Sequence, residues 1–251
     1  MGVVQRFLSY ELFRTFLKEG SRSTKTDLSR DSLRPPLMSA EPLSPATPAA
    51  VARRDITGVI LAGGRGSRMG GEDKGLVLLN GRPMVEHVIA RLRPQVSEIL
   101  ISANRNQERY AAFGARVVPD LIEGYQGPLA GIASGMRTAT TPYVVTVPCD
   151  SPLIGADLVA RLGRALSRER AEVAVAHDGS RTHPVFLLLE RALLPSLTKF
   201  LEAGERKIDR WFAQHRVATA DFSDCPEAFL NVNDPGEHRA LETRLREARL
   251  C

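Results

Sequence analysis

The sequence has few cysteines, few aromatic residues and no long apolar run, and these shortages exclude several classes of protein. The chain of 251 residues contains three cysteines, none of them in a C-x-x-C pair, which argues against a zinc ribbon and a disulfide framework. No stretch of about 18 apolar residues occurs, so the pattern excludes a membrane span. We therefore expect a protein of the reducing cytoplasm.

A strong excess of charge of one sign is also missing. The formal net charge is +5, but residues 1–55 hold 9 basic and 6 acidic residues, which leaves 25 basic against 23 acidic residues in the rest. A nucleic-acid-binding domain concentrates basic residues on one face. We therefore expect no nucleic-acid partner, and we expect small anionic ligands held in a local pocket.

The first 55 residues differ in composition from the rest of the chain. Apolar residues in 1–20 have loosely helical spacing, but charged residues interrupt them, so this segment is not a secretory signal. Residues 41–55 are rich in proline and alanine, which is typical of a linker. We predict that residues 1–55 are a disordered or dispensable extension and that residues 56–251 form one domain.

From Ile56 onward, apolar runs typical of strands alternate with helical patterns. Strands are predicted at 56–62, 98–104, 115–120, 143–150, 171–177, 183–190 and 217–222, and helices at 83–93, 129–138, 156–166, 192–202, 207–215 and from 235. This alternation predicts a doubly wound α/β fold, with a mostly parallel sheet and helices on both faces. After the turn DGSRT, the run at 183–190 is expected to be antiparallel to its neighbour. Ligands bind such folds at the carboxyl ends of the strands.

A glycine-rich, basic loop follows the first predicted strand. The stretch LAGGRGSRMGGEDKG at 61–75 carries Arg65, Arg68 and Lys74 among its glycines. Glycines let backbone N–H groups turn toward an anion, so the loop is suited to a polyphosphate. It is not a Walker loop, because no Ser or Thr follows Lys74. It is not the dinucleotide fingerprint either, since Met69 stands where the last glycine is required.

Polar residues close two of the predicted strands on the same edge as this loop. Asp120 and Asp150 each follow an apolar strand, where a carboxylate needs a partner. For Asp150 a magnesium ion is the simplest partner, because the alternative, capping the helix near Ala156, would need a later position. Asp120 is either a ligand-binding residue or a turn residue. Asn231 and Asn233 can bind a hydroxyl, a metal or the backbone, but NDP is also a good turn signal.

Further motifs follow the loop in a fixed order: GPLAG at 127–131, PCDSP at 148–152, HDG-x-R-x-HP at 177–184, AGER at 203–206, DFSD at 221–224 and F-x-NVN at 229–233. Together with the loop, they resemble the motifs of the molybdenum cofactor guanylyltransferases, and the resemblance covers residue 56 to about 245. It implies transfer of GMP from Mg-GTP to the molybdopterin cofactor with release of pyrophosphate. Attack by the acceptor phosphate needs alignment and charge neutralisation rather than a covalent intermediate.

The resemblance also implies roles for the matching residues. Where this family often has an asparagine that contacts guanine, the chain has Ser102, which leaves that contact open; Asn104 could partly replace it. The implied roles are nucleotide binding for Leu61, Ala62, Gly63, Lys74, Ser102, Asn104, Asp120 and Asp150, catalysis for Arg68, Lys74 and Asp150, magnesium binding for Asp150, and the acceptor or metal side for Asn231 and Asn233.

Three other functions fit parts of the pattern. A cytidylyltransferase for the same cofactor shares the loop and differs in base recognition. A sugar- or lactate-phosphate nucleotidyltransferase is a second alternative, and a catalytically inactive nucleotide-binding protein is a third. Lys74 and Asp150 argue against the inactive protein, which needs no phosphate clamp with a metal carboxylate. The expected partners are GTP, molybdopterin and, transiently, proteins that deliver the cofactor or mature molybdoenzymes.

Overall fold

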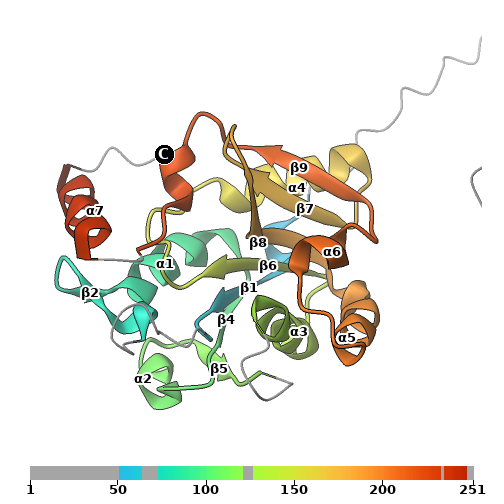
Figure 1. Cartoon of the computed structure of the whole chain (residues 1–251), viewed down its shortest axis with the longest axis horizontal. Coiled ribbons are helices and arrows are strands. Elements are labelled where there is room, and N and C mark those ends of the chain that lie inside the picture. Colours follow the sequence, from blue (N-terminus) through green and yellow to red (C-terminus); the bar gives the residue numbers. More distant parts are fainter. Residues whose placement is uncertain (1–50, 64–72, 121–126, 233–234, 248–251) are drawn as a thin grey trace, which may run out of the picture. The chain divides into compact units, whose positions relative to one another are not determined.

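A computed structural model describes residues 51–63, 73–120, 127–232 and 235–247. In these ranges the central feature is a seven-stranded sheet with the order β5-β4-β1-β6-β8-β7-β9 (Figure 1). Every strand except β8 runs in the same direction, as the predicted mostly parallel sheet requires. The strands are β1 (Ile56–Leu61), β4 (Glu98–Ser102), β5 (Arg116–Val118), β6 (Tyr143–Pro148), β7 (Val173–His177), β8 (Thr182–Glu190) and β9 (Val217–Asp221).

Helices cover both faces of this sheet. Side chains of α1 and α4 pack in one apolar cluster, and those of α3, α5 and α6 pack in another on the opposite face. This arrangement confirms the predicted doubly wound α/β fold. The helices are α1 (Met84–Leu92), α2 (Gln107–Ala111), α3 (Pro128–Thr138), α4 (Leu158–Glu169), α5 (Leu194–Glu202), α6 (Ile208–Phe212) and α7 (Pro235–Glu247). Among the described residues, no helix is long and apolar enough to span a bilayer.

Strand β1 lies at the centre of the parallel part and is buried on both sides. Ile56 and Ile60 point into the cluster with α1, whereas Val59 points into the cluster with α3. A strand covered on both faces needs apolar side chains at successive positions. The run ITGVI meets this need. Its one polar side chain, Thr57, is buried at little cost because its hydroxyl forms hydrogen bonds with Glu98 and Thr141.

The order of the strands creates a crevice at the end of β1. From β1 the chain moves outward to β4 and β5 and then returns to the other side of β1 as β6. In the register of these strands, Leu61 lies beside both Ser102 and Pro148. A reversal of strand order at the carboxyl ends leaves a crevice where ligands bind in open α/β sheets. The loop predicted to bind phosphate leaves the sheet at this point.

Some local features differ from the sequence prediction, and one agrees with it. The helix α2 and a short hairpin of β2 (Leu78–Leu79) and β3 (Arg82–Pro83) were not predicted. The strand β8 pairs antiparallel with β6 and β7, as expected. Val51, placed in the extension from the sequence, packs against the core, and Arg53 donates a hydrogen bond of 2.9 Å to the carbonyl of Val96. Dispensability therefore stays a prediction for the residues before Val51.

Candidate functional site

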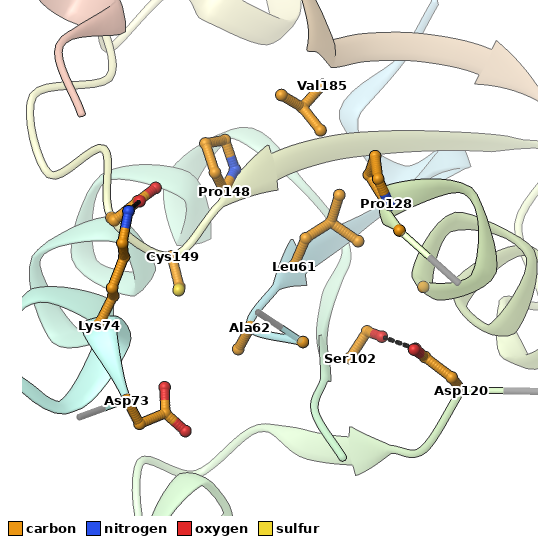
Figure 2. A pocket seen from close by; sticks show the side chains of 14 residues that line it. Leu61, Ala62, Asp73, Lys74, Ser102, Asp120, Pro128, Pro148, Cys149 and Val185 are labelled. Carbon is orange, nitrogen blue, oxygen red and sulfur yellow. Dashed lines mark hydrogen bonds and ion pairs between the residues drawn. The ribbon is translucent and has the colours of Figure 1, made fainter. Parts of the chain in front are cut away.

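A cavity of about 290 Å³ opens at the carboxyl ends of β1, β4 and β6 (Figure 2). It lies where the strand order reverses. Lys74 and Asp73 lie on one side of Leu61 and Ala62, and Ser102 with Asp120 lies on the other. The cavity is lined by Leu61, Ala62, Gly63, Asp73, Lys74, Ser102, Asp120, Gly127, Pro128, Gly131, Pro148, Cys149, Asp150 and Val185.

Most of the residues predicted to bind nucleotide meet in this cavity. Of the eight, Asn104 alone is absent from the lining, and it contacts the site through Asp120. Asn231 is outside the lining but is tied to the segment beside it, because the hydroxyl of Ser151, which follows the lining residue Asp150, donates a hydrogen bond to its side-chain oxygen. Arg68 and Asn233 lie outside the described residues.

An ion pair joins the two groups predicted to act on phosphate and metal. The Lys74 Nζ lies 3.1 Å from Asp150 Oδ2, and the two side chains are 23% and 12% exposed. Lys74 begins the short 3-10 helix η2 (Lys74–Leu76), which follows the loop. Asp150 directly follows Cys149 at the end of β6, and its carbonyl accepts a hydrogen bond from Val232 N. The pair places a cation and a carboxylate at one end of the cavity.

Asp120 forms the polar end on the opposite side. Its Oδ1 accepts a hydrogen bond of 3.0 Å from the Ser102 hydroxyl, and its Oδ2 accepts one of 2.7 Å from Asn104 Nδ2. The Asp120 backbone N–H in turn donates to Asn104 Oδ1 at 2.9 Å. Both carboxylate oxygens are thus fixed in orientation, and each keeps capacity to accept a further hydrogen bond. Ser102 lines the cavity and holds Asp120 in place.

The motif GPLAG brings the start of α3 against the cavity. A Cβ on Gly131 would lie 2.8 Å from Ser102 Oγ and 3.0 Å from Leu61 Cδ2, so any larger residue would force these side chains to shift. The preceding Gly127 has φ +78°, a value that glycine adopts at little cost, and Pro128 stands at the first helical position. The motif therefore serves helix–sheet packing and the shape of the cavity at once.

Asp73 is a lining residue that the sequence analysis did not single out. Its carboxylate accepts a hydrogen bond of 3.0 Å from Asn106 Nδ2 and another from the Tyr110 hydroxyl. Both donors belong to the start and body of α2, the helix that was not predicted. The sequence feature that could have identified Asp73 is its position directly before Lys74, at the end of the glycine-rich loop.

Cys149 has a free thiol that is buried beside these acids. Burial, and then the charges of Asp150 and Asp73, raise the pKa of this thiol well above its ordinary value. A thiol that stays protonated is a poor nucleophile. This fits a direct transfer reaction better than one with a covalent intermediate on this cysteine.

The residues present fit a divalent cation bound together with phosphate. Within the described ranges, no group of three or more His, Cys, Asp or Glu side chains is placed to hold a metal. Mg²⁺, however, needs one or two carboxylates when substrate phosphates and water complete its shell. Asp150 offers such a hard oxygen ligand at the cavity wall. Its role in metal binding stays a prediction.

The motif HDG-x-R-x-HP forms the turn between β7 and β8. Asp178 Oδ1 accepts hydrogen bonds from the backbone N–H groups of Ser180 and Arg181, and His183 Nε2 lies 2.7 Å from its Oδ2. The Arg181 N–H first, and then His183 and Ser180, hold the pKa of Asp178 below its usual range. His183 stacks on Phe229 with ring centroids 4.4 Å apart. A second cavity, of about 340 Å³, lies beside this turn.

Comparisons with known proteins find a family model, relatives and solved structures that are similar to the chain. The model of the MobA-like NTP transferase domain matches residues 58–219. Molybdenum cofactor guanylyltransferases of Shewanella sp. (strain MR-4) and Shewanella sediminis are 54% and 55% identical to the chain over 77% and 74% of its length, and over 98% and 95% of theirs.

Two solved structures share the fold. Molybdopterin-guanine dinucleotide biosynthesis protein A from Archaeoglobus fulgidus has a TM-score of 0.66 at 19% identity, over 76% of this chain and all of its own. The 2-C-methyl-D-erythritol 4-phosphate cytidylyltransferase from Thermus thermophilus has a TM-score of 0.57 at 18% identity, and the match covers 79% of this chain and all of that one.

Proposed function

Because the chain belongs to the MobA-like NTP transferase family, we propose that it transfers GMP from GTP to molybdopterin and releases pyrophosphate. The relatives at about 54% identity are named for this reaction and align over nearly their whole length. The observation that carries the proposal is the cavity, which separates a phosphate-binding end with Lys74 and Asp150 from a polar end with Asp120. A nucleoside triphosphate needs these two ends.

At the phosphate end, Lys74 binds and orients the triphosphate. Its ammonium group stands at the exit of the glycine-rich loop and reaches the cavity wall. Phosphoryl-group chemistry of this kind depends on alignment and on neutralising the charge of the equatorial oxygens. Arg68, in the same loop, is proposed to add a second positive charge. The acceptor phosphate attacks the α-phosphorus directly, so no side chain has to act as a nucleophile.

Asp150 is the residue we propose to hold Mg²⁺. Its carboxylate lies within reach of any phosphate bound by Lys74, because the two side chains are already 3.1 Å apart. A bound divalent ion supplies neutralisation of the triphosphate charge during transfer. Asp150 contributes the anionic oxygen, and Lys74 moves from the carboxylate to a phosphate oxygen.

The polar end favours guanine over cytosine. Asp120 is held by Ser102 and Asn104, which both donate to it. A carboxylate offers only acceptors to a base. Guanine presents two adjacent donors on its Watson–Crick edge, the ring N–H and the exocyclic amino group, whereas cytosine presents one amino donor. The small Ser102 leaves the carboxylate, rather than an amide, as the group that contacts the nucleoside.

The acceptor is proposed to approach from the side of Asn231. The second cavity is lined by Phe229 and Leu230, the two residues before Asn231. Strand β8 joins the two cavities, since Val185 lines the first and His183 lines the second. The cytoplasmic location and the transient contacts with proteins that deliver or receive the cofactor are part of the same proposal.

The test is pyrophosphate release with each of the four ribonucleoside triphosphates, with and without molybdopterin. We expect release with GTP only, and only when molybdopterin and Mg²⁺ are present. Release with CTP alone would instead identify a cytidylyltransferase. Tight GTP binding without release under any condition would identify the inactive nucleotide-binding protein.

A further inference from the structure

We propose that Tyr110 is a positioning residue, whose buried hydroxyl group holds the turn that carries Lys74 in the orientation needed to bind the triphosphate. The inference rests on the proposed role of Lys74 in binding phosphate. Tyr110 itself is fully buried and does not line the cavity. It acts on the site through Asp73 and Gly75, the two neighbours of Lys74 in the chain.

The first link is the hydrogen bond to Asp73. The Tyr110 hydroxyl donates to Asp73 Oδ1, and Asn106 Nδ2 donates to Asp73 Oδ2 at 3.0 Å. The two donors fix both oxygens of the carboxylate. Asp73 also begins the 3-10 turn, since its carbonyl accepts a hydrogen bond of 2.9 Å from Leu76 N. The residue before Lys74 is therefore fixed through its side chain and through its backbone.

The second link is the contact with Gly75. A Cβ on Gly75 would lie 2.6 Å from the Tyr110 hydroxyl oxygen and 3.1 Å from Cys149 Sγ. The phenolic oxygen thus occupies the space beside the residue that follows Lys74. Because both neighbours are held, the backbone of Lys74 has little freedom, and its ammonium group is directed at Asp150, 3.1 Å away.

The hydroxyl keeps its role as a donor at any ordinary pH. Burial first, and then the neighbouring Cys149 and the hydrogen-bonded carboxylate of Asp73, raise the pKa of Tyr110 far above its usual value. A neutral phenol that donates to a carboxylate makes one of the stronger classes of hydrogen bond. Position 110 therefore requires tyrosine for a reason other than core packing, which phenylalanine would provide equally well.

The variant that isolates the hydroxyl is Tyr110→Phe. It keeps the ring, with its edge contact to Phe113, and removes both links, the bond to Asp73 and the oxygen beside Gly75. Loss of a hydrogen bond to a charged group is expected to weaken GTP binding by about tenfold, and GMP binding less, because GMP has one phosphate where GTP has three. Tyr143→Phe is the matched control, because Tyr143 begins β6 at the opposite edge of the sheet.

A double-mutant cycle separates positioning from packing. The affinities for GTP and GMP, and kcat and KM for GTP, are measured for Tyr110→Phe, Lys74→Ala and the double variant, with melting temperatures as the check on folding. If Tyr110 acts through Lys74, its loss should change GTP affinity less than about twofold once Lys74 is gone. Gly75→Ala, which pushes against the hydroxyl, should reproduce the greater loss for GTP.

Three outcomes would overturn the inference: a Tyr110→Phe protein with wild-type GTP affinity and turnover, equal losses for GTP and GMP, or effects that add in the double variant. These outcomes leave the proposed function intact. A wild-type protein that transfers no GMP and does not prefer GTP to GMP would overturn the proposed function, and this inference with it.

Discussion

Two polar clusters at the same edge of the sheet, the β7–β8 turn and the first cavity, differ in where their partners come from. In the turn, the carboxylate of Asp178 takes its hydrogen bonds from Ser180, Arg181 and His183, all within five positions of it. In the cavity, Lys74 and Asp150 are 76 positions apart. The turn is closed by its own residues, whereas the cavity exists only after the sheet has formed.

This difference separates a cluster that stabilises a turn from the proposed binding site. The acceptor capacity of Asp178 is largely used by its neighbours in the turn, so the cluster mainly stabilises the hairpin. The groups of the cavity have partners that are more distant in the sequence, and they line open space. A charged motif in a sequence therefore says little about binding until the partners of its polar groups are known.

The largest expected effect is the loss of transfer in Asp150→Asn. The amide keeps the shape of the side chain but removes the anionic oxygen that Mg²⁺ requires. We expect a folded protein that binds GTP weakly and transfers no GMP at any practical magnesium concentration. Pyrophosphate release measured across a magnesium titration checks this.

The matched control is Asp224→Asn. Asp224 also pairs with a cation, Arg161, at 2.6 Å, but on the surface. This control should keep normal turnover. Wild-type turnover of Asp150→Asn with an unchanged magnesium dependence would place the metal elsewhere.

Lys74→Ala should reduce turnover with GTP by about a hundredfold or more, because it removes a cation placed where charge develops. The melting temperature should change little, since the Lys74 side chain is partly exposed and contributes no apolar core. Steady-state kinetics and thermal unfolding together check this. Lys199→Ala, at an exposed position on α5, is the control, and near-normal rates in a folded Lys74→Ala protein would refute the phosphate role.

Gly131→Ala should have an intermediate effect, because it damages the cavity through packing. The added methyl group would meet Ser102 Oγ at 2.8 Å, and overpacking of this kind costs about 1–3 kcal/mol. We expect a lower melting temperature and a higher KM for GTP. Gly163→Ala in α4, where the nearest atom would be 3.5 Å away, should be neutral or stabilising by up to about 1 kcal/mol. Equal behaviour of the two variants would show that the approach of α3 does not shape the site.

Asp178→Asn should have the smallest effect, which should be on stability and not on GTP affinity. Because folding lowers the pKa of Asp178, its stabilising contribution is present above the unfolded pKa of about 3.9 and is lost as the pH falls through the folded value. The variant should melt below the wild type at pH 7, and the difference should shrink toward pH 2. Asp209→Asn, at an exposed position, is the control. A large loss of GTP affinity in Asp178→Asn would contradict a purely structural turn.

The sequence predicted those parts of the molecule that depend on local pattern and on strand order. Apolar runs located the strands, and the ends of two of them located Asp120 and Asp150. The sequence could not place Asp73, because its partner Tyr110 lies 37 positions away on a helix of five residues, too short to show a periodic pattern. It also left open what Ser102 does, since a serine buried at a strand end gives no sign of the carboxylate that it contacts.

The ion pair between Lys74 and Asp150 affects how the cation and the nucleotide enter the site. The two groups form an ion pair at 3.1 Å. If Asp150 holds the cation and Lys74 the triphosphate, loading the site is an exchange of partners, in which both groups give up one ionic contact for another. Whichever ligand arrives first releases the protein group that the other needs. Cation and nucleotide should therefore strengthen each other's binding by the same factor, as reciprocal linkage requires.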